Sequence, residues 1–439
     1  MKKLYFIIVF LIIVVVGGVL RYKDLYTWPR EGATFDEYAW SYLGMSLLTN
    51  GVPVSWSPHT PYKDVMNYRN PRAATFRLVR PYLEHPPFFG LVAGISNKVF
   101  GAKNLDEIDI HSIRPLAFIL GIISIGAVFF FASCFYGPTI GLMSAGIYSI
   151  FPSVAVGSRI LQNENFFIPL FLISLGLAKL YVDRKNKIFL YLLFVFSFVL
   201  PLSKIPWVAS PLASSLYLFS QKKWKESLGV IAMTVLSVAA FFLYGILYGK
   251  EVFFALWKLQ LARYDLSFGS FFKMFQDPII TDRLFLDGWV YMGWIVLFVV
   301  ISANYKKHYG IIAGFFSYLL VFLFAIPGES GHGWYRYPFY PFFAVSFAVF
   351  LKEGIGKMPQ IMCPVLTLLG LLLLETVWVP VFGFSFVLHR AWLLMCAVIG
   401  LPVFLKGKWF KRIGIIATYT ALAIICILSV YAILQYNEQ

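Results

Sequence analysis

Two acidic motifs stand at the edges of apolar segments, where an ionised side chain is costly. Asp36 and Glu37 follow the first apolar run, and Glu164 lies in the polar stretch 158–165. A carboxylate at such a place could act as a general base that takes the proton of an acceptor hydroxyl or amine. The structural alternative for the first motif is helix capping by Thr34 or Asp36, because acids are favoured in the first turn of a helix.

A third acidic motif, Glu84-His85, directly precedes two prolines. Pro86 and Pro87 restrict the backbone, so that both side chains project from a fixed point. The motif could bind substrate, or it could cap a helix and anchor it at the membrane interface. Glu84 is also a candidate ligand for a divalent metal, although two adjacent ligands do not make a metal site. The sequence therefore names no certain cofactor.

Basic residues occur in other short polar turns that lead into apolar runs. Lys204 stands between two such runs, and Arg336 is flanked by Tyr335 and Tyr337. Either cation could hold a phosphate, the arginine through two parallel hydrogen bonds. The structural alternatives are snorkelling of the lysine toward lipid headgroups and an ordinary aromatic belt around the arginine. Arg159 belongs to the same polar stretch as Glu164, and Arg159, Tyr335 and Tyr337 are also candidate substrate-binding residues.

The composition shows the setting of these motifs. Of the 439 residues, 59% are hydrophobic and 13% are charged, whereas about a quarter are charged in a soluble domain. The deficit extends along the whole chain. It excludes a disordered protein, a coiled coil and an ordinary cytosolic enzyme, and it indicates a polytopic membrane protein. Loops that face anionic lipid explain the net charge of +16. We therefore expect the protein to contact membrane lipids and not nucleic acid.

Apolar runs and basic clusters predict an all-α topology of about 13 spans, each of about 20 residues. Short loops rich in Lys and Arg stay in the cytoplasm, which puts the amino terminus inside and the carboxyl terminus outside. The stretch 87–100 then cannot cross and is expected to lie as a helix in the outer interface. The first run is predicted to be an uncleaved anchor rather than a signal peptide. The expected spans are 5–20, 115–133, 139–153, 165–182, 188–203, 205–220, 227–248, 288–303, 310–326, 338–351, 360–379, 386–405 and 413–435.

Most acidic residues fall in segments that this topology places outside, with Glu375 as an exception inside a span. Two outer segments are long, 21–114 and 249–287, and loops of this length usually have a role. The Phe-rich stretch 268–275 in the second segment is predicted to be a membrane anchor. Polar residues gathered on one face indicate chemistry at the outer membrane surface.

The order of these motifs resembles that of the GT-C integral-membrane glycosyltransferases, closest to the branch of protein O-mannosyltransferases and lipid A aminoarabinose transferases. The spacing matches over residues 1–345, which we expect to form a transmembrane catalytic module with outer loops 21–114 and 249–287. Residues 346–439 match only as hydrophobic spans. The matching pieces are Asp36-Glu37 after the first span, Glu84-His85-Pro86-Pro87, Arg159 with Glu164, Lys204 at a span mouth, and Arg336-Tyr337 before Pro338.

The resemblance implies a hexosyl- or pentosyltransferase with a polyprenyl-phosphate sugar donor and a glycan, lipid or protein acceptor. Transfer would occur with inversion at the outer face of a prokaryotic plasma membrane. By the same resemblance Asp36 is the general base, Glu164 a second acid near donor or acceptor, and Lys204 and Arg336 hold the donor phosphate. Glu84 matches a position that can lie near a metal in the aminoarabinose branch, which has lysine where this chain has His85.

Two other classes remain as alternatives. A transporter or flippase for a lipid-linked or anionic substrate usually has ionisable residues or broken helices near the membrane midplane, and these spans are almost free of charge. A glycan polymerase or ligase would share the basic outer loops but would use a diphosphate-linked donor. The chemistry of the donor therefore separates this second alternative from the main interpretation.

Overall fold

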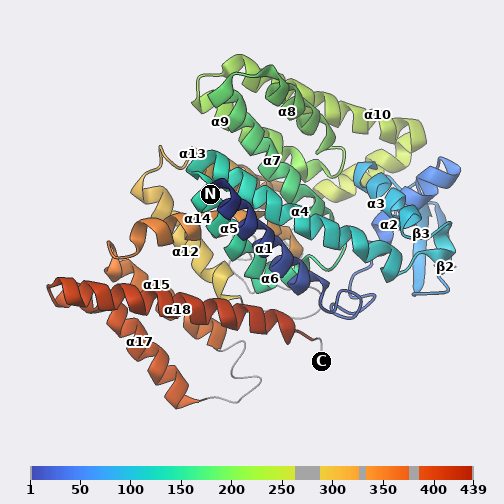
Figure 1. The fold of residues 1–439 in the computed structure, drawn as a ribbon. Helices are drawn as coiled ribbons and strands as arrows, with labels where there is room; N and C mark the ends of the chain where they lie inside the picture. The colour runs from blue at the N-terminus through green and yellow to red at the C-terminus, as the bar shows by residue number, and fades with distance from the viewer. Residues whose placement is uncertain (1, 263–286, 326–332, 375–384, 438–439) are drawn as a thin grey trace.

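In the computed structural model the described residues are 2–262, 287–325, 333–374 and 385–437. Within them the chain is a long helical bundle with a small sheet at one end (Figure 1). Glu375 and the Phe-rich stretch 268–275, like most of the outer segment 249–287, lie outside the described residues.

Every expected span overlaps a helix, so the prediction of a helical membrane protein is confirmed. Among the described residues, six helices are long and apolar enough to cross a membrane by length and composition, and the total of 13 spans stays a prediction. The helices that match the expected spans are α1 (Lys2–Tyr22), α4 (Ile110–Tyr136), α5 (Pro138–Ile150), α7 (Asn163–Arg184), α8 (Lys187–Val199), α9 (Ala209–Ser220), α10 (Trp224–Ala262), α12 (Gly288–Ala303), α13 (Tyr309–Ala325), α14 (Tyr340–Gly354), α15 (Pro359–Leu373), α17 (Phe386–Phe404) and α18 (Lys408–Leu434).

The centre of the bundle is formed by α4, which packs along α5 and α7, and by α12 and α14. Sharp reversals between neighbouring helices depend on local sequence. Gly137 ends α4 with a φ of +86°, in the region that favours glycine, and Pro138 then starts α5 with its fixed φ. Small residues also let aromatic rings approach the helices: a Cβ at Gly176 would lie 2.3 Å from the ring of Phe130.

The first outer segment folds into a compact layer at one end of the bundle. Its helices are α2 (Asp36–Asn50) and α3 (Phe88–Val99), and its strands β1 (Ser55–Trp56), β2 (Asp64–Arg69) and β3 (Thr75–Arg80) form an antiparallel sheet in the order β1-β3-β2. The all-helical prediction did not include this sheet. The predicted helix over 87–100 is present as the 12 residues of α3, and its position in the outer interface stays a prediction.

Glycines determine how α2 and α3 cross. A Cβ on Gly44 would lie 1.8 Å from the carbonyl oxygen of Gly90, and one on Gly94 would lie 2.4 Å from the backbone of Gly44. Only glycine permits this approach of two backbones. The close crossing sets the direction of α2, whose first residue is Asp36.

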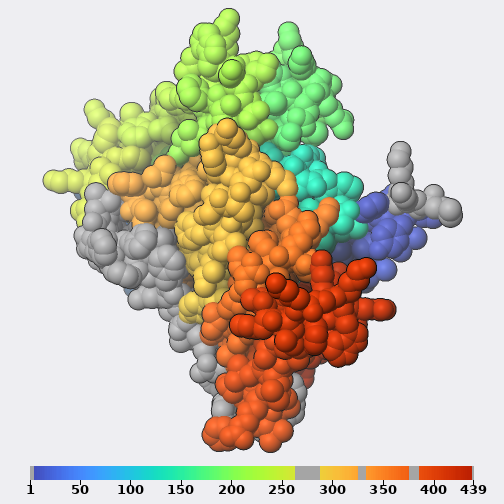
Figure 2. All heavy atoms as spheres, turned by 90° about the vertical axis from the view of Figure 1, so that its left-hand side faces the viewer, coloured from blue at the N-terminus to red at the C-terminus, as the bar shows by residue number. Residues whose placement is uncertain are grey.

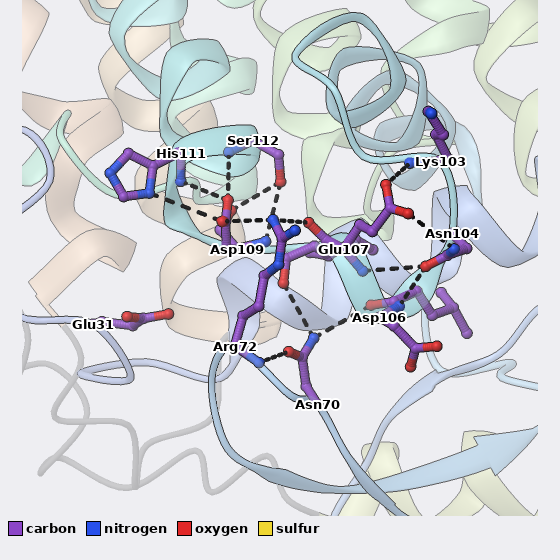
Figure 3. A network of polar contacts seen from close by, with 12 residues as sticks. Glu31, Asn70, Arg72, Lys103, Asn104, Asp106, Glu107, Asp109, His111 and Ser112 are labelled. Atoms are coloured by element: carbon purple, nitrogen blue, oxygen red, sulfur yellow. Dashed lines mark hydrogen bonds and ion pairs between the residues drawn. The ribbon is translucent and has the colours of Figure 1, made fainter.

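A polar network joins this outer layer to the start of α4 (Figure 3). Asn70, in the turn between β2 and β3, donates to the carbonyl oxygens of Leu105 and Ile108 at 3.3 and 3.1 Å. Arg72 forms an ion pair with Asp109 at 3.2 Å, and Asp109 caps α4 by accepting from the backbone N–H of Ser112. These bonds connect the sheet to the bundle.

Candidate active site

Four segments that are distant in sequence meet beneath the outer layer: the start of α2, the start of α7, the turn before η2 (Ile205–Val208) and η3 (Gly333–Phe339). η2 packs against α9 and α13, and η3 packs against α7, α13 and α14. The bundle thus brings the predicted residues Asp36, Glu164, Lys204 and Tyr335 into one region.

Lys204 and Glu164 form a buried ion pair. The Lys204 Nζ donates to Glu164 Oε1 at 2.7 Å, and the exposed fractions of the two residues are 8% and 0%. The second carboxylate oxygen of Glu164 is buried without a hydrogen-bond partner among the described residues. The lysine ammonium also lies over two aromatic rings, 4.8 Å from the centroid of Tyr335 and 5.3 Å from that of Trp207. The pair is therefore only partly satisfied.

Asp36 is half-buried at the first position of α2, and its backbone N–H donates to Thr34 Oγ1 at 3.2 Å. Burial raises the pKa of its carboxyl to about 6, since the attraction of Lys204 is outweighed by burial and by the nearby charges of Glu164 and Glu37. Burial alone would lower the pKa of Lys204, but Glu164, Tyr335 and Asp36 raise it above its ordinary value. The site therefore holds a permanent cation next to a carboxyl that titrates near neutral pH.

Glu37 points elsewhere, because adjacent helix residues are separated by about 100° around the helix axis. Its carboxylate forms a bidentate pair with Arg114, at 3.1 and 3.2 Å, and both side chains are buried. Arg114 also donates to the carbonyl oxygens of Leu25, Pro29 and Arg30. Glu37 thus fixes the direction of the loop before α2.

Hydrogen bonds between the start of α7 and the chain around η2 determine the position of Lys204. Trp207 Nε1 donates to Asn163 Oδ1 at 2.6 Å, and Asn163 Nδ2 donates to the carbonyl oxygen of Ser203 at 3.0 Å. The Trp207 ring stacks on Phe167 of α7 at a centroid distance of 4.1 Å. Both contacts hold η2 against the start of α7, and so hold the lysine against Glu164.

Arg336 is buried in η3, with an exposed fraction of 3%. The neighbouring Tyr337 lies close enough to both Arg336 and Glu164 to interact electrostatically with each. The Tyr337 hydroxyl occupies the space above Gly157, where a Cβ would lie 2.1 Å from it. Tyr337 thus lies between the region of the ion pair and that of Arg336, and the contact of Arg336 with a phosphate stays a prediction.

Arg159 directs its hydrogen bonds to the ends of other helices. Its guanidinium donates to the carbonyl oxygens of Leu20, Trp28 and Ile433 at 3.0, 3.2 and 3.4 Å. These contacts join the end of α1 to the end of α18. The position suits a residue that orients the polar stretch before α7, and the predicted substrate contact stays a prediction.

Glu84 and His85 diverge. Glu84 forms an ion pair with His59 at 3.5 Å and accepts a hydrogen bond from Ser57. The ring of His85 lies beside Trp40, with a centroid distance of 5.3 Å. No group of three His, Cys, Asp or Glu side chains suited to hold a metal occurs in the part of the chain that the structure describes.

The sequence and fold were compared with known proteins. The family model described as dolichyl-phosphate-mannose-protein mannosyltransferase matches residues 84–248, a range that includes Glu84, Glu164 and Lys204. Among curated proteins, none matches.

Solved structures match over nearly the whole chain. ArnT from Cupriavidus metallidurans, solved with bound undecaprenyl phosphate, is 16% identical with a TM-score of 0.56, over 98% of this chain and 76% of its own. This chain has the GT-C fold. The archaeal oligosaccharyltransferase AglB from Archaeoglobus fulgidus is 13% identical, with a TM-score of 0.53 over 96% of this chain and 56% of its own. The arabinosyltransferase EmbB from Mycobacterium smegmatis is 11% identical, with a TM-score of 0.55 over 97% and 40%.

Within this GT-C fold, several residues that build the site were missed from the sequence. Arg114 lies at the start of an apolar run, and its charge there was a signal that a buried acidic partner exists. The sequence does not distinguish Asn163 from the other polar residues of its stretch, or Trp207 from the many other aromatic residues. His59 lies beside Glu84 in an ion pair, but no local pattern marks it.

Proposed function

We propose that this protein is an inverting glycosyltransferase that moves a sugar from a polyprenyl-phosphate donor to an acceptor at the outer membrane face. The observation that carries the proposal is the position of Asp36, whose carboxyl lies within electrostatic reach of the buried Glu164–Lys204 pair. A base and a fixed cation in one site are the two groups that displacement of a phosphate by a hydroxyl or amine requires. The undecaprenyl phosphate in the ArnT structure and the dolichol phosphate in the AglB structure support a lipid-phosphate donor.

In the proposed reaction, Asp36 accepts the proton of the acceptor hydroxyl or amine as that group attacks the anomeric carbon of the donor sugar. The bond between this carbon and the phosphate oxygen breaks, and its electron pair stays on the polyprenyl phosphate. Attack opposite the leaving group inverts the configuration. Lys204 stabilises the charge of the phosphate and Arg336 adds a second cation, so no general acid is needed. With a pKa of about 6, most Asp36 side chains are ionised at pH 7.

The other residues have positioning roles in this proposal. Glu37 and Arg114 orient the start of α2, Arg159 joins helix ends, and Glu164 holds Lys204 while its second oxygen is available to a sugar or acceptor hydroxyl. Residues 1–345 form the catalytic module, and 346–439 complete the bundle. The basic turns, which favour the cytoplasmic side, support a site on the opposite, outer side of the membrane, and we propose that this is a prokaryotic plasma membrane.

The Asp36→Asn variant tests the base. We expect a loss of transfer of about 10²- to 10⁴-fold, with donor binding largely retained, in the purified protein supplied with a panel of polyprenyl-phosphate-linked hexoses and pentoses. Active donors and acceptors are first identified by mass spectrometry of lipid-linked sugars and glycans from cells with and without the protein. Asp64→Asn is the matched control, because Asp64 is exposed on β2. Near-normal transfer by Asp36→Asn contradicts the mechanism.

The same panel separates the proposal from the polymerase or ligase class. AglB, an oligosaccharyltransferase, shares the fold, so diphosphate-linked oligosaccharides belong in the panel. If product forms only from diphosphate-linked donors, the monophosphate donor of this proposal is wrong and the polymerase or ligase class is favoured. Movement of the lipid across a vesicle membrane without any transfer of sugar would favour the transporter or flippase class.

A further inference from the structure

A basic hollow lies at the opposite end of the molecule from the outer sheet, between the turn that joins α14 to α15 and the turn that joins α17 to α18. Its volume is about 510 Å³, within the range of small-molecule sites. Figure 2 views the molecule from this side, with the red start of α18 toward the viewer. Four lysines from both turns line it: Lys357, Lys406, Lys408 and Lys411.

Within the described parts of the chain, no acidic side chain balances the positive charge of this hollow. Its lining contains no Asp or Glu, and none of the four lysines forms an ion pair among the described residues. The nearest acid in sequence, Glu353, pairs with Lys307. Four ammonium groups around one space repel one another, so an anion that enters it gains from all four.

Glycines and prolines constrain the backbone of both turns. Gly356 has a φ of +73° and Gly407 a φ of +144°, in the region that side chains disfavour. A Cβ on Gly356 would also lie 2.9 Å from the side chain of Ile415 in α18. Pro359 and Pro402 line the hollow and restrict the adjoining chain. The lysines therefore come from two constrained turns that pack on each other.

The rim of the hollow is apolar and open. Val403 and Leu405 on the lining are exposed, and Phe404 and Trp409, which adjoin lining residues in the sequence, are 83% and 66% exposed. In a helical membrane protein, exposed aromatic and aliphatic side chains beside lysines mark the boundary between acyl chains and headgroups. The lysines then stand at the level of lipid phosphates, where a soluble phosphate would leave the apolar rim uncovered.

We propose that this hollow is a binding site for the phosphate-bearing headgroup of an anionic membrane phospholipid. The four lysines hold the phosphate, while the glycerol and first acyl carbons contact the apolar rim. Basic hollows between helix ends on the side of the basic loops have the charge and depth for such headgroups. Lipid binding at this hollow does not require sugar transfer, so this proposal is independent of the proposed function.

The test measures lipid retained by the full-length protein in native mass spectrometry after mixing with phosphatidylglycerol or phosphatidylcholine. One variant replaces the four lysines of the hollow by glutamine. The matched control makes the same four changes, and so the same change in charge, at exposed lysines on other turns of the same side: Lys185, Lys187, Lys222 and Lys225.

We expect the wild type to retain phosphatidylglycerol about tenfold better than phosphatidylcholine, the hollow variant to lose this preference, and the control to keep it. Equal loss in both variants would show attraction by diffuse charge and overturn the site. Displacement by millimolar glycerol phosphate would show a site for a soluble anion and overturn the lipid as ligand. If the fourfold variant is not monodisperse, Lys406→Gln/Lys411→Gln is measured in the same way, against Lys185→Gln/Lys187→Gln.

Discussion

Two buried ion pairs at the starts of α2 and α7 are built in different ways. In the pair of Glu37 and Arg114, both carboxylate oxygens accept from the guanidinium, and Arg114 donates to three further carbonyl oxygens. In the pair of Glu164 and Lys204, one hydrogen bond joins the partners and one carboxylate oxygen has no partner among the described residues. The first pair is saturated, whereas the second has capacity for further contacts.

The difference teaches how neighbouring charges can have separate tasks. A saturated buried pair fixes a loop, because every donor is used and a ligand could only compete with protein contacts. A partly satisfied pair costs stability, which is typical of positions that bind a ligand. Asp36 belongs to the second region and Glu37 to the first, although they are adjacent in the sequence. The five predictions below test this division.

The largest effect is expected when the saturated pair is removed. Glu37→Met/Arg114→Met deletes both charges and leaves the carbonyl oxygens of Leu25, Pro29 and Arg30 without their donor. We expect the free energy of unfolding to fall by about 3–5 kcal/mol, seen as a lower melting temperature and loss of monodisperse protein in detergent. A melting temperature close to that of the wild type would show that these contacts do not stabilise the loop.

The same substitutions at the second pair provide the counterpart. Glu164→Met/Lys204→Met removes both charges together, so no unpaired charge remains, and the free energy of unfolding should change by only about 1 kcal/mol. Binding of a polyprenyl phosphate should weaken by about 10- to 100-fold, the value of a charge-assisted hydrogen bond. The measurement is donor-lipid affinity beside the melting temperature. Unchanged affinity would contradict the phosphate role of Lys204.

This division marks the limit of what the sequence predicts. Helices were predictable because a bilayer-length apolar run is a local property of the chain, and every expected span overlaps a helix. The separate roles of Asp36 and Glu37 were not, because they depend on Arg114, which is 77 positions from Glu37 and meets it only after α4 packs beneath the outer layer.

The sheet escaped prediction for a related reason. Strand β2 is mostly exposed along its length, so it lacks the alternation of apolar and polar residues that identifies a half-buried strand. The motif order named Glu164 and Lys204 as candidate site residues, and the structure joins them in an ion pair. It did not predict that Glu84 and His85 would diverge, since adjacent side chains outside regular structure have no fixed relative direction.

The third prediction concerns pH and belongs to the second region alone. Because burial raises the pKa of Asp36 to about 6, transfer should fall below pH 6, to about a tenth at pH 5, since the base must be ionised. Lys204 favours the ionised carboxylate, so Lys204→Met should move the midpoint of the rate profile to higher pH. A rate that is constant from pH 5 to 7 would exclude Asp36 as the base.

The same shift has a consequence for stability. A folded-state pKa above the ordinary value of 3.8 means that the folded protein binds the proton more tightly than the unfolded chain. Stability from this group is present at low pH and is lost as the pH rises through the window from about 4 to 6. Asp36→Asn should therefore be more stable than the wild type at pH 7, by roughly 1–3 kcal/mol. Equal melting temperatures at pH 7 would contradict a strained carboxylate.

The smallest effect is expected from the aromatic ring above the lysine. Tyr335 places its ring 4.8 Å from the Lys204 ammonium, whereas the described residues show no ring over Arg114. Tyr335→Leu should weaken donor binding by about two- to fivefold, because a cation–π contact contributes about 0.5–1 kcal/mol, and Tyr335→Phe should retain most of the affinity. The backbone carbonyl of residue 335, which accepts from the Tyr318 hydroxyl at 2.7 Å, is unaffected by either change. If Tyr335→Phe weakens donor binding as much as Tyr335→Leu, the hydroxyl of Tyr335 rather than its ring contributes to the affinity. The Glu164–Lys204 pair would then be oriented by a hydrogen bond to the ligand and not by the aromatic rings around the lysine.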